Sequence, residues 1–162
     1  MKISILTVCF NSEKTIEKTF QSVQNQTYKD IEYIVVDGKS TDQTLDIAKI
    51  YSSSITKLVS EKDKGLYDAM NKGISLATGD LVRILNSDDV FTDDRVLERI
   101  AKFHQEHDIE ASVGSIIQFN EAGKTVRTYA SKHWHPEKLK IGFMPPHPSI
   151  FFKRELFESF GN

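Results

Sequence analysis

Short apolar runs alternate with amphipathic segments over residues 3–104, and this alternation restricts the fold more than any other feature of the chain. The runs are only five or six residues long and rich in strand-favouring side chains, and they lie at residues 3–8, 31–36, 55–60 and 81–85. Between them, apolar residues recur at helical spacing, as Ile16, Phe20 and Val23 do. Repeated strand–helix units have right-handed crossovers, which place their strands parallel in one sheet. The sequence therefore predicts an α/β fold with a mostly parallel central sheet flanked by helices.

Capping residues predict where the helices begin. Asn11-Ser12 would cap a first helix that reaches about residue 26, and Ser40 or Thr41 would cap a second one. Further helices are expected over residues 66–77 and 93–104, where apolar residues again form a stripe.

The pattern changes after residue 106. Residues 111–119 and 124–129 flank the turn-forming segment 120–123, which predicts a β-hairpin, and residues 153–160 resemble a short helix. With 162 residues and no repeat, low-complexity tract or linker, we expect one domain.

Composition excludes several classes of function. A net charge of −2 and a hydrophobic fraction of 39% favour neither disorder nor a nucleic-acid partner. The single cysteine, Cys9, cannot build a disulfide framework or a zinc cluster. No signal peptide or membrane-spanning run is visible, so we expect a cytoplasmic location, with peripheral contact at the inner face of a membrane left open.

The run 81–85 leads directly into the adjacent carboxylates of Asp88 and Asp89. Because the carboxyl ends of parallel strands meet at one edge of a sheet, this pair should lie near the ends of the other strands. Neighbouring carboxylates repel each other, and a divalent cation such as Mn²⁺ or Mg²⁺ would stabilise them and attract substrate phosphates. The alternative is a turn in which both residues only end the strand. Glycine-rich dinucleotide or P-loop motifs are missing from the sequence, which disfavours those phosphate sites.

Three segments, taken in order, resemble the nucleotide-sugar-binding half of the family 2 glycosyltransferases, which have the Rossmann-like GT-A fold. They are residues 5–11, 35–42 and 85–89, and residues 63–73 are also similar to a segment of bacterial members that build surface polysaccharides. The resemblance implies a single GT-A domain, with residues 1–106 as the nucleotide-sugar-binding part and residues 107–162 as the start of the acceptor-side part.

The resemblance also implies roles for individual residues. Val8 would meet the nucleobase through its backbone and Phe10 through its ring, while Asp37 would contact base or ribose. The other implied nucleotide-binding residues are Asn11, Asp63 and Ser87. Three of these have a simpler alternative: Phe10 as core, Asp37 as a turn former before Gly38, and Asp63 as a solvated surface residue.

The metal would be held by Asp88 and Asp89, because Asn86 stands where the family's D-x-D motif has its first carboxylate. His147, held between two prolines, is a candidate for the acceptor side or the metal side of the site.

The implied reaction is transfer of a sugar, with inversion, from a nucleoside diphosphate donor to an acceptor hydroxyl. We expect a UDP-sugar as donor and a glycan or lipid-linked glycan as acceptor, and the sequence leaves the oligomeric state open. The base that takes the acceptor's proton is expected beyond Asn162, so the chain is expected to be a truncated domain. Glu155 and Glu158 have no motif support and are not nominated. Two alternatives stay open: a sugar nucleotidyltransferase, and a nucleotide-binding module without turnover.

Overall fold

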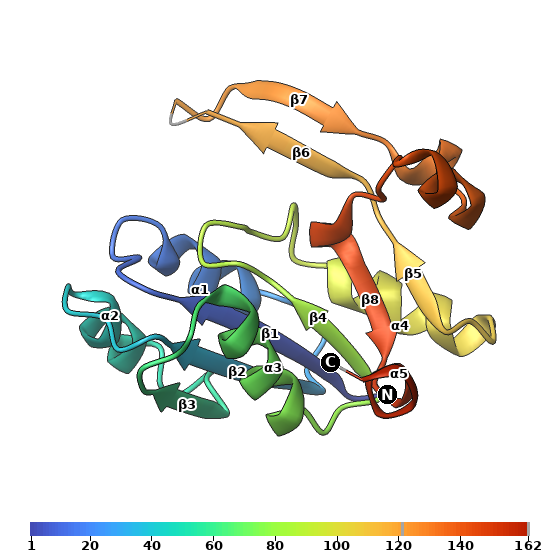
Figure 1. Cartoon of the computed structure of the whole chain (residues 1–162). Helices are drawn as coiled ribbons and strands as arrows, with labels where there is room; N and C mark the ends of the chain where they lie inside the picture. Colours follow the sequence, from blue (N-terminus) through green and yellow to red (C-terminus); the bar gives the residue numbers. More distant parts are fainter. Residues whose placement is uncertain (121, 162) are drawn as a thin grey trace.

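The computed structural model describes residues 1–120 and 122–161, and a six-stranded sheet runs through its centre (Figure 1). The strand order is β3-β2-β1-β4-β8-β5. Four strands are parallel, namely β1 (Ile3–Cys9), β2 (Ile31–Asp37), β3 (Lys57–Ser60) and β4 (Leu81–Ile84). The short strand β8 (Ile150–Lys153) pairs antiparallel with both β4 and β5 (Ala111–Val113). The predicted α/β fold with a mostly parallel central sheet is confirmed.

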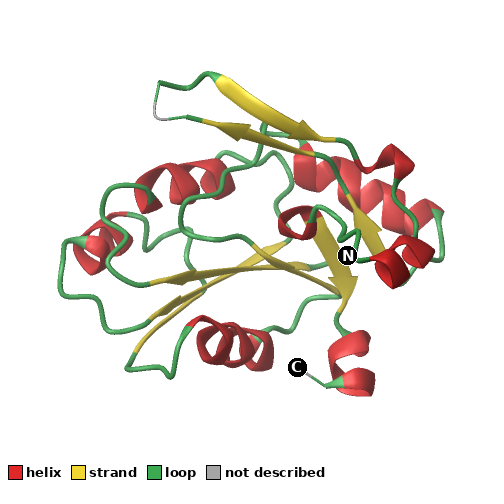
Figure 2. Cartoon of the chain, turned by 45° about the horizontal axis from the view of Figure 1, so that its top comes forward, coloured by secondary structure: helices red, strands yellow, loops and turns green. Residues whose placement is uncertain are grey.

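Helices cover both faces of the sheet (Figure 2). On one face lie α1 (Ile16–Gln24), α2 (Thr44–Ile50) and α4 (Val96–Glu106), and on the other lie α3 (Leu66–Leu76) and α5 (Glu155–Phe160). Side chains alternate between the faces along β1, so that Ile3 and Ile5 join one apolar cluster and Leu6 and Val8 the other. Every residue of β1 is buried, as expected of a central strand.

Two helices begin later than the capping residues predicted. The first begins at Ile16 because Asn11 has a positive φ of 49° and its side-chain oxygen accepts a hydrogen bond of 2.9 Å from the Thr41 amide. The second begins at Thr44, whose amide donates to Asp42 Oδ1 at 3.0 Å. The predicted caps were wrong because Asn11 connects the loops after β1 and β2 instead of ending a helix.

The expected strand over residues 111–119 is divided into two strands. β5 joins the main sheet, whereas β6 (Ile116–Phe119) pairs with β7 (Thr125–Tyr129) in a separate hairpin, which confirms the hairpin but shortens its first strand. The chain leaves the sheet at Gly114, whose carbonyl accepts a hydrogen bond of 2.7 Å from Ser149 Oγ. Residue 121 of the predicted turn lies outside the described residues.

Three short 3₁₀ helices lead from the hairpin back to the sheet, where the apolar run after Ser149 forms β8. They are η1 (Ser131–His133), η2 (Pro136–Ile141) and η3 (His147–Ser149). Among the described residues, no helix has both the length and the apolar character that crossing a membrane requires.

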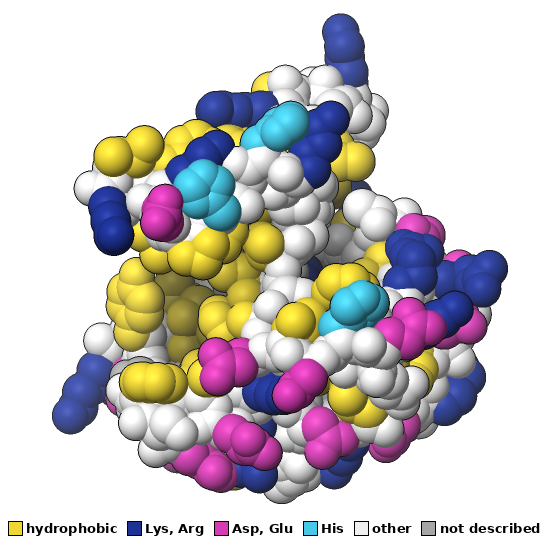
Figure 3. Space-filling view, turned by 90° about the vertical axis from the view of Figure 1, so that its right-hand side faces the viewer, with side chains coloured by type: hydrophobic (Ala, Val, Ile, Leu, Met, Phe, Trp, Pro, Cys, Tyr) yellow, Lys and Arg dark blue, Asp and Glu magenta, His cyan; other side chains and the backbone are white. Residues whose placement is uncertain are grey.

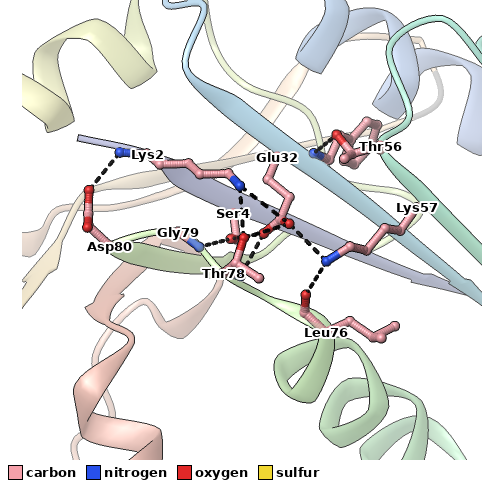
Figure 4. A network of polar contacts seen from close by, with 10 residues as sticks. Lys2, Ser4, Glu32, Thr56, Lys57, Leu76, Thr78, Gly79 and Asp80 are labelled. Atoms are coloured by element: carbon pink, nitrogen blue, oxygen red, sulfur yellow. Dashed lines mark hydrogen bonds and ion pairs between the residues drawn. The ribbon is translucent and has the colours of Figure 1, made fainter.

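A polar network closes the end of the sheet where β1 and β2 begin (Figure 4). Its centre is the buried carboxylate of Glu32, which accepts hydrogen bonds from Ser4 Oγ at 2.6 Å and from the Thr78 amide at 2.7 Å. Lys57 Nζ lies 3.0 Å and Lys2 Nζ 3.6 Å from Glu32 Oε1. This end of the sheet is therefore held by side-chain contacts, whereas the other end is hollowed.

Candidate active site

A cavity of about 1060 Å³ opens at the carboxyl ends of β1 and β4. Its walls come from the end of β1 and the loop after it, the start of α3, the exit of β4 and the segment from η3 into β8. Seven of the predicted site residues line it: Val8, Phe10, Asn11, Asp63, Ser87, Asp88 and His147. In the space-filling view, hydrophobic side chains gather in a hollow below the part of the molecule that carries the hairpin (Figure 3).

Phe10 lies on the cavity surface and is 61% exposed, so it is not a core residue. Its ring lies beside Gly38, where an added Cβ would be 3.4 Å from Phe10 Cδ2 and 2.6 Å from Asp63 Oδ2. The lack of a side chain at Gly38 therefore lets the Phe10 ring and the Asp63 carboxylate approach each other. Together they offer an aromatic face beside a hydrogen-bond acceptor, which suits a planar heterocycle with polar edges.

Asp37 is fully buried and does not line the cavity. Its carboxylate accepts hydrogen bonds from the Ser40 amide at 3.0 Å and from Ser60 Oγ at 2.6 Å, and a further one from Ser40 Oγ. Ser40 Oγ in turn accepts from the Asn11 amide at 2.8 Å. In this conformation Asp37 holds the loops that carry Asn11, and its contact with base or ribose stays a prediction.

The exit of β4 forms an acidic corner, defined here as residues 86–89. Asp88 is exposed to the cavity, and the Ser87 hydroxyl shares a hydrogen bond of 2.9 Å with Ser12. Asp89 instead lines a second cavity of about 460 Å³. Burial raises the pKa of Asp89, and the neighbouring Asp88 raises it further. Asp88 thus contributes to the lining of the first cavity and Asp89 to that of the second, and both belong to one turn.

The acidic corner also contains an amide oxygen that lacks a partner. Asn86 Nδ2 donates to Asp89 Oδ2 at 3.3 Å, but the buried Oδ1 of Asn86 has no hydrogen-bond partner among the described residues. Within the same residues, no group of three or more His, Cys, Asp or Glu side chains is arranged to hold a metal ion. The unpartnered amide oxygen and the two carboxylates nevertheless fit Mg²⁺ or Mn²⁺, which take oxygen ligands and keep several waters.

Two further residues of the cavity, His147 and Cys9, differ in exposure and in what their side chains can do chemically. His147 is exposed, lies in η3 and is followed by Pro148, which lines both cavities. Cys9 also lines the first cavity, but burial, and secondarily the charge of Asp37, raises the pKa of its thiol. A thiol that stays protonated is a poor nucleophile, so covalent catalysis by Cys9 is disfavoured.

Sequence reasoning missed several lining residues, among them Lys14, Thr15, Tyr67 and Met70. Tyr67 and Met70 belong to the first turn and a half of α3, which lies beside the cavity. The apolar stripe of segment 63–73 predicts packing against the sheet, and it does not show that the first turns of α3 also reach the cavity. The available signal was Tyr67, a large aromatic residue that lies beside the apolar stripe and not on it.

Comparisons with known proteins agree with this geometry. The family model described as Glycosyl transferase family 2 matches residues 4–159. A PGL/p-HBAD biosynthesis glycosyltransferase of Mycobacterium bovis is 32% identical in an alignment 162 positions long, which covers 98% of this chain and 61% of the relative. Glycosyltransferase GlyA of Streptococcus pneumoniae is 32% identical over 123 residues, which are 75% of this chain and 18% of the relative. The chain thus spans about three fifths of the length of the mycobacterial relative.

Two solved structures have the same fold. S. aureus TarS 1–349 in complex with UDP-GlcNAc superposes with a TM-score of 0.82 at 24% sequence identity, covering 98% of this chain and 47% of TarS 1–349. The mannosyltransferase PcManGT of Pyrobaculum calidifontis, in complex with GDP-Man and Mn²⁺, superposes with a TM-score of 0.75 at 21% sequence identity. The superposition covers 99% of this chain and 47% of the PcManGT chain.

Proposed function

Because the chain belongs to glycosyltransferase family 2, we propose that it carries the donor-binding part of an enzyme that moves a sugar from a nucleoside diphosphate to an acceptor hydroxyl. The observation that carries this proposal is one cavity with an exposed aromatic ring at one side and the acidic corner at the other. A nucleoside diphosphate has the same order of groups, with a flat base at one end and charged phosphates at the other. Inversion at the anomeric carbon is part of the proposal, as the family resemblance implies.

The nucleobase is proposed to stack on Phe10, with Val8 contacting it through the backbone and Asp63 accepting a hydrogen bond from base or ribose. We propose UDP as the nucleotide. The support is that TarS, which has the same fold, was solved with UDP-GlcNAc, although the GDP-Man bound to PcManGT marks a second type of donor for this fold.

Asp88, with Asn86 Oδ1 and Asp89, is proposed to hold Mn²⁺ or Mg²⁺. Such an ion, when bound, would neutralise charge that develops on the departing diphosphate. The chain's own part is to keep these oxygens at the cavity edge, and the hydrogen bond between Asn86 and Asp89 fixes two of the side chains. Ser87 and His147 line the same cavity. We propose that Ser87 contacts the nucleotide and that His147 lies on the acceptor side or the metal side.

The acceptor is proposed to be a glycan or a lipid-linked glycan, approached through residues 107–162. The mycobacterial relative's name, which refers to PGL/p-HBAD biosynthesis, supports a glycoconjugate product. A cytoplasmic location belongs to the same proposal.

Calorimetric titration with UDP, in the presence and absence of Mn²⁺, tests the donor site. We expect Mn²⁺-dependent binding, a loss of UDP affinity of about 10- to 100-fold in Asp88→Asn, and a loss of about tenfold in Phe10→Ala because the stacking surface is removed. Asp46→Asn is the matched control, since Asp46 forms only an exposed ion pair with Lys49 on α2. Equal UDP affinity in wild type and Asp88→Asn, with and without Mn²⁺, would refute the metal-assisted donor site.

A further inference from the structure

The central strand β4 carries a buried cation that the proposed donor site does not use. Arg83 is only 7% exposed, and its neighbours in the chain, Leu81, Val82 and Leu85, are fully buried apolar residues. Its guanidinium lies over two aromatic rings, with Cζ 4.9 Å from the centroid of Phe91 and 4.8 Å from that of Phe151. These cation–π contacts stabilise the guanidinium group at this position.

Among the residues that the structure describes, the guanidinium of Arg83 has no hydrogen-bonded or ion-paired partner. Its buried Nε has no hydrogen-bond partner, and no hydrogen bond or ion pair joins the guanidinium to any residue that the structure describes. Burial lowers the pKa of Arg83 to about 10, while the charge of Asp89 opposes this shift, so the side chain stays protonated at neutral pH. A buried charge without a partner is unfavourable unless something else supplies the counter-charge.

The second cavity would let an anion reach Arg83. Its volume is about 460 Å³, and Arg83, Asp89, Phe91 and Phe151 line its inner part while Ile117 and Phe119 of the hairpin line its rim. Pro148 borders both cavities, so the second one lies next to the proposed site of transfer. A cavity of this size with apolar walls and few polar groups is typical of a small-ligand site.

We propose that the second cavity binds an anionic group of the acceptor, a carboxylate or a phosphate, with Arg83 as the residue that recognises it. The planar guanidinium, which lies over two rings, can donate to two oxygens of such a group at once. The identity of the ligand as acceptor rests on the proposed transferase function, whereas the anion site itself does not.

A competing explanation is that Arg83 only balances the charge of Asp89. The two side chains interact electrostatically, but their nitrogen and oxygen atoms are not within ion-pair distance, and the partner of Asp89 is Asn86. Under that explanation, the second cavity binds an anion no more tightly than an uncharged ligand.

Amide chemical shifts of the ¹⁵N-labelled chain can separate the two explanations. The probes are methyl glucuronide, inorganic phosphate and the uncharged methyl glucoside, and the reporters are the amides of residues 114–117 and of Phe151. We expect at least one of the two anions to shift these amides with at least tenfold higher affinity than methyl glucoside. Whichever anion binds more tightly identifies the group. Equal affinity for methyl glucoside and both anions, or no binding of any probe, would overturn the proposal.

Arg83→Gln should remove the preference for anions over methyl glucoside, because the guanidinium that would bind them is lost. If Arg83→Gln fails to fold, variants at the rim of the second cavity test the same proposal. Ile117 is 46% exposed on the hairpin, so its replacement leaves the core intact. Ile117→Glu should weaken anion binding about fivefold, and Ile117→Lys should leave it unchanged or strengthen it. An affinity that is the same in both variants would contradict an anion site at this place.

A second titration, with UDP and Mg²⁺, tests the donor site with the same ¹⁵N-labelled chain. Its reporters are the amide chemical shifts of Val8 and Asn11. If UDP fails to shift these amides while an anion still shifts residues 114–117, the donor proposal is lost and the anion site stands. If UDP shifts the amides of Val8 and Asn11 while no anion shifts residues 114–117, the anion-site proposal is refuted and the donor proposal stands.

Discussion

Asn86 occupies the position at which the side chain decides how strongly the acidic corner attracts a cation. Its amide donates to Asp89 and leaves one oxygen unpartnered, so two carboxylates and one neutral oxygen are available. Asn86→Asp adds a third negative charge, and affinity for a hard cation increases with ligand charge. We expect Mn²⁺ binding, measured by electron paramagnetic resonance, to become tighter on the order of tenfold.

The matched control for this prediction is Asn71→Asp, which adds the same charge at an exposed position of α3. Unchanged Mn²⁺ affinity in Asn86→Asp, or an equal gain in Asn71→Asp, would show that Asn86 does not contribute to the site.

Most residues of the candidate site were predictable because parallel strands end at one edge of a sheet. Phe10 and Asp88 follow β1 and β4, which are neighbours, so both reach the same cavity. The directions of single side chains were not predictable. Asp37 points into the protein because Ser40 and Ser60 satisfy its carboxylate, and Asp89 lines the second cavity and not the first. Both depend on loop conformations that residue type alone does not determine.

Among the elements, α3 approaches the sheet most closely at Gly73. A Cβ added there would lie 1.9 Å from Leu6 Cδ1, and Leu6 is fully buried in the central strand and has no room to move away. We therefore expect Gly73→Ala to lower the free energy of unfolding by about 1–3 kcal/mol, although alanine favours a helix. Denaturant unfolding followed by circular dichroism measures this change.

Asn71→Ala, on the exposed side of the same helix, separates packing from helix propensity. We expect it to leave the stability unchanged or to raise it by about 0.5 kcal/mol. If Gly73→Ala were as stable as wild type, the close contact between α3 and β1 would be wrong.

Elements with long periodic patterns were predicted well, whereas short elements made by distant contacts were not. The segments that form β1, β2, α3 and α4 carry their own apolar pattern, so the sequence shows them directly. β8 has four residues, and its pairing with β4 and β5 is decided by contacts across the chain. For the same reason, the break between β5 and β6 at Gly114 depends on Ser149, which lies 35 residues away.

The stability of the whole molecule depends on pH through Glu32. Burial alone would raise the pKa of Glu32, but hydrogen bonds from Ser4, Thr78 and Lys57 outweigh it and lower the pKa from 4.5 to about 2. A depressed carboxylate pKa gives stability that is complete above pH 4.5 and is lost as the pH falls from 4.5 toward 2. We expect this group to account for a loss on the order of 2 kcal/mol over that range, measured by urea unfolding at several pH values.

Glu32→Gln provides the matched test of this linkage. At neutral pH it should be less stable than wild type by about 2 kcal/mol, because Lys57 and Lys2 lose their buried partner. The difference should shrink as the pH approaches 2, where wild-type Glu32 becomes protonated as well. Asp46→Asn, which removes an exposed ion pair, should change stability by less than about 0.5 kcal/mol. A constant difference between Glu32→Gln and wild type across this pH range would refute the assignment.

The position of β8 between β4 and β5 has a consequence for the order of folding. β1 pairs with both β2 and β4, and these three strands can assemble as soon as residues 3–84 are available. β5 cannot reach the sheet until β8 is present, because its hydrogen bonds in the sheet go to β8. During synthesis, the part of the sheet made by β8 and β5, next to the proposed acceptor side, therefore forms last. It forms only after residue 153 has emerged from the ribosome. Until then, the edge of β4 is unpaired and open to non-native strand pairing.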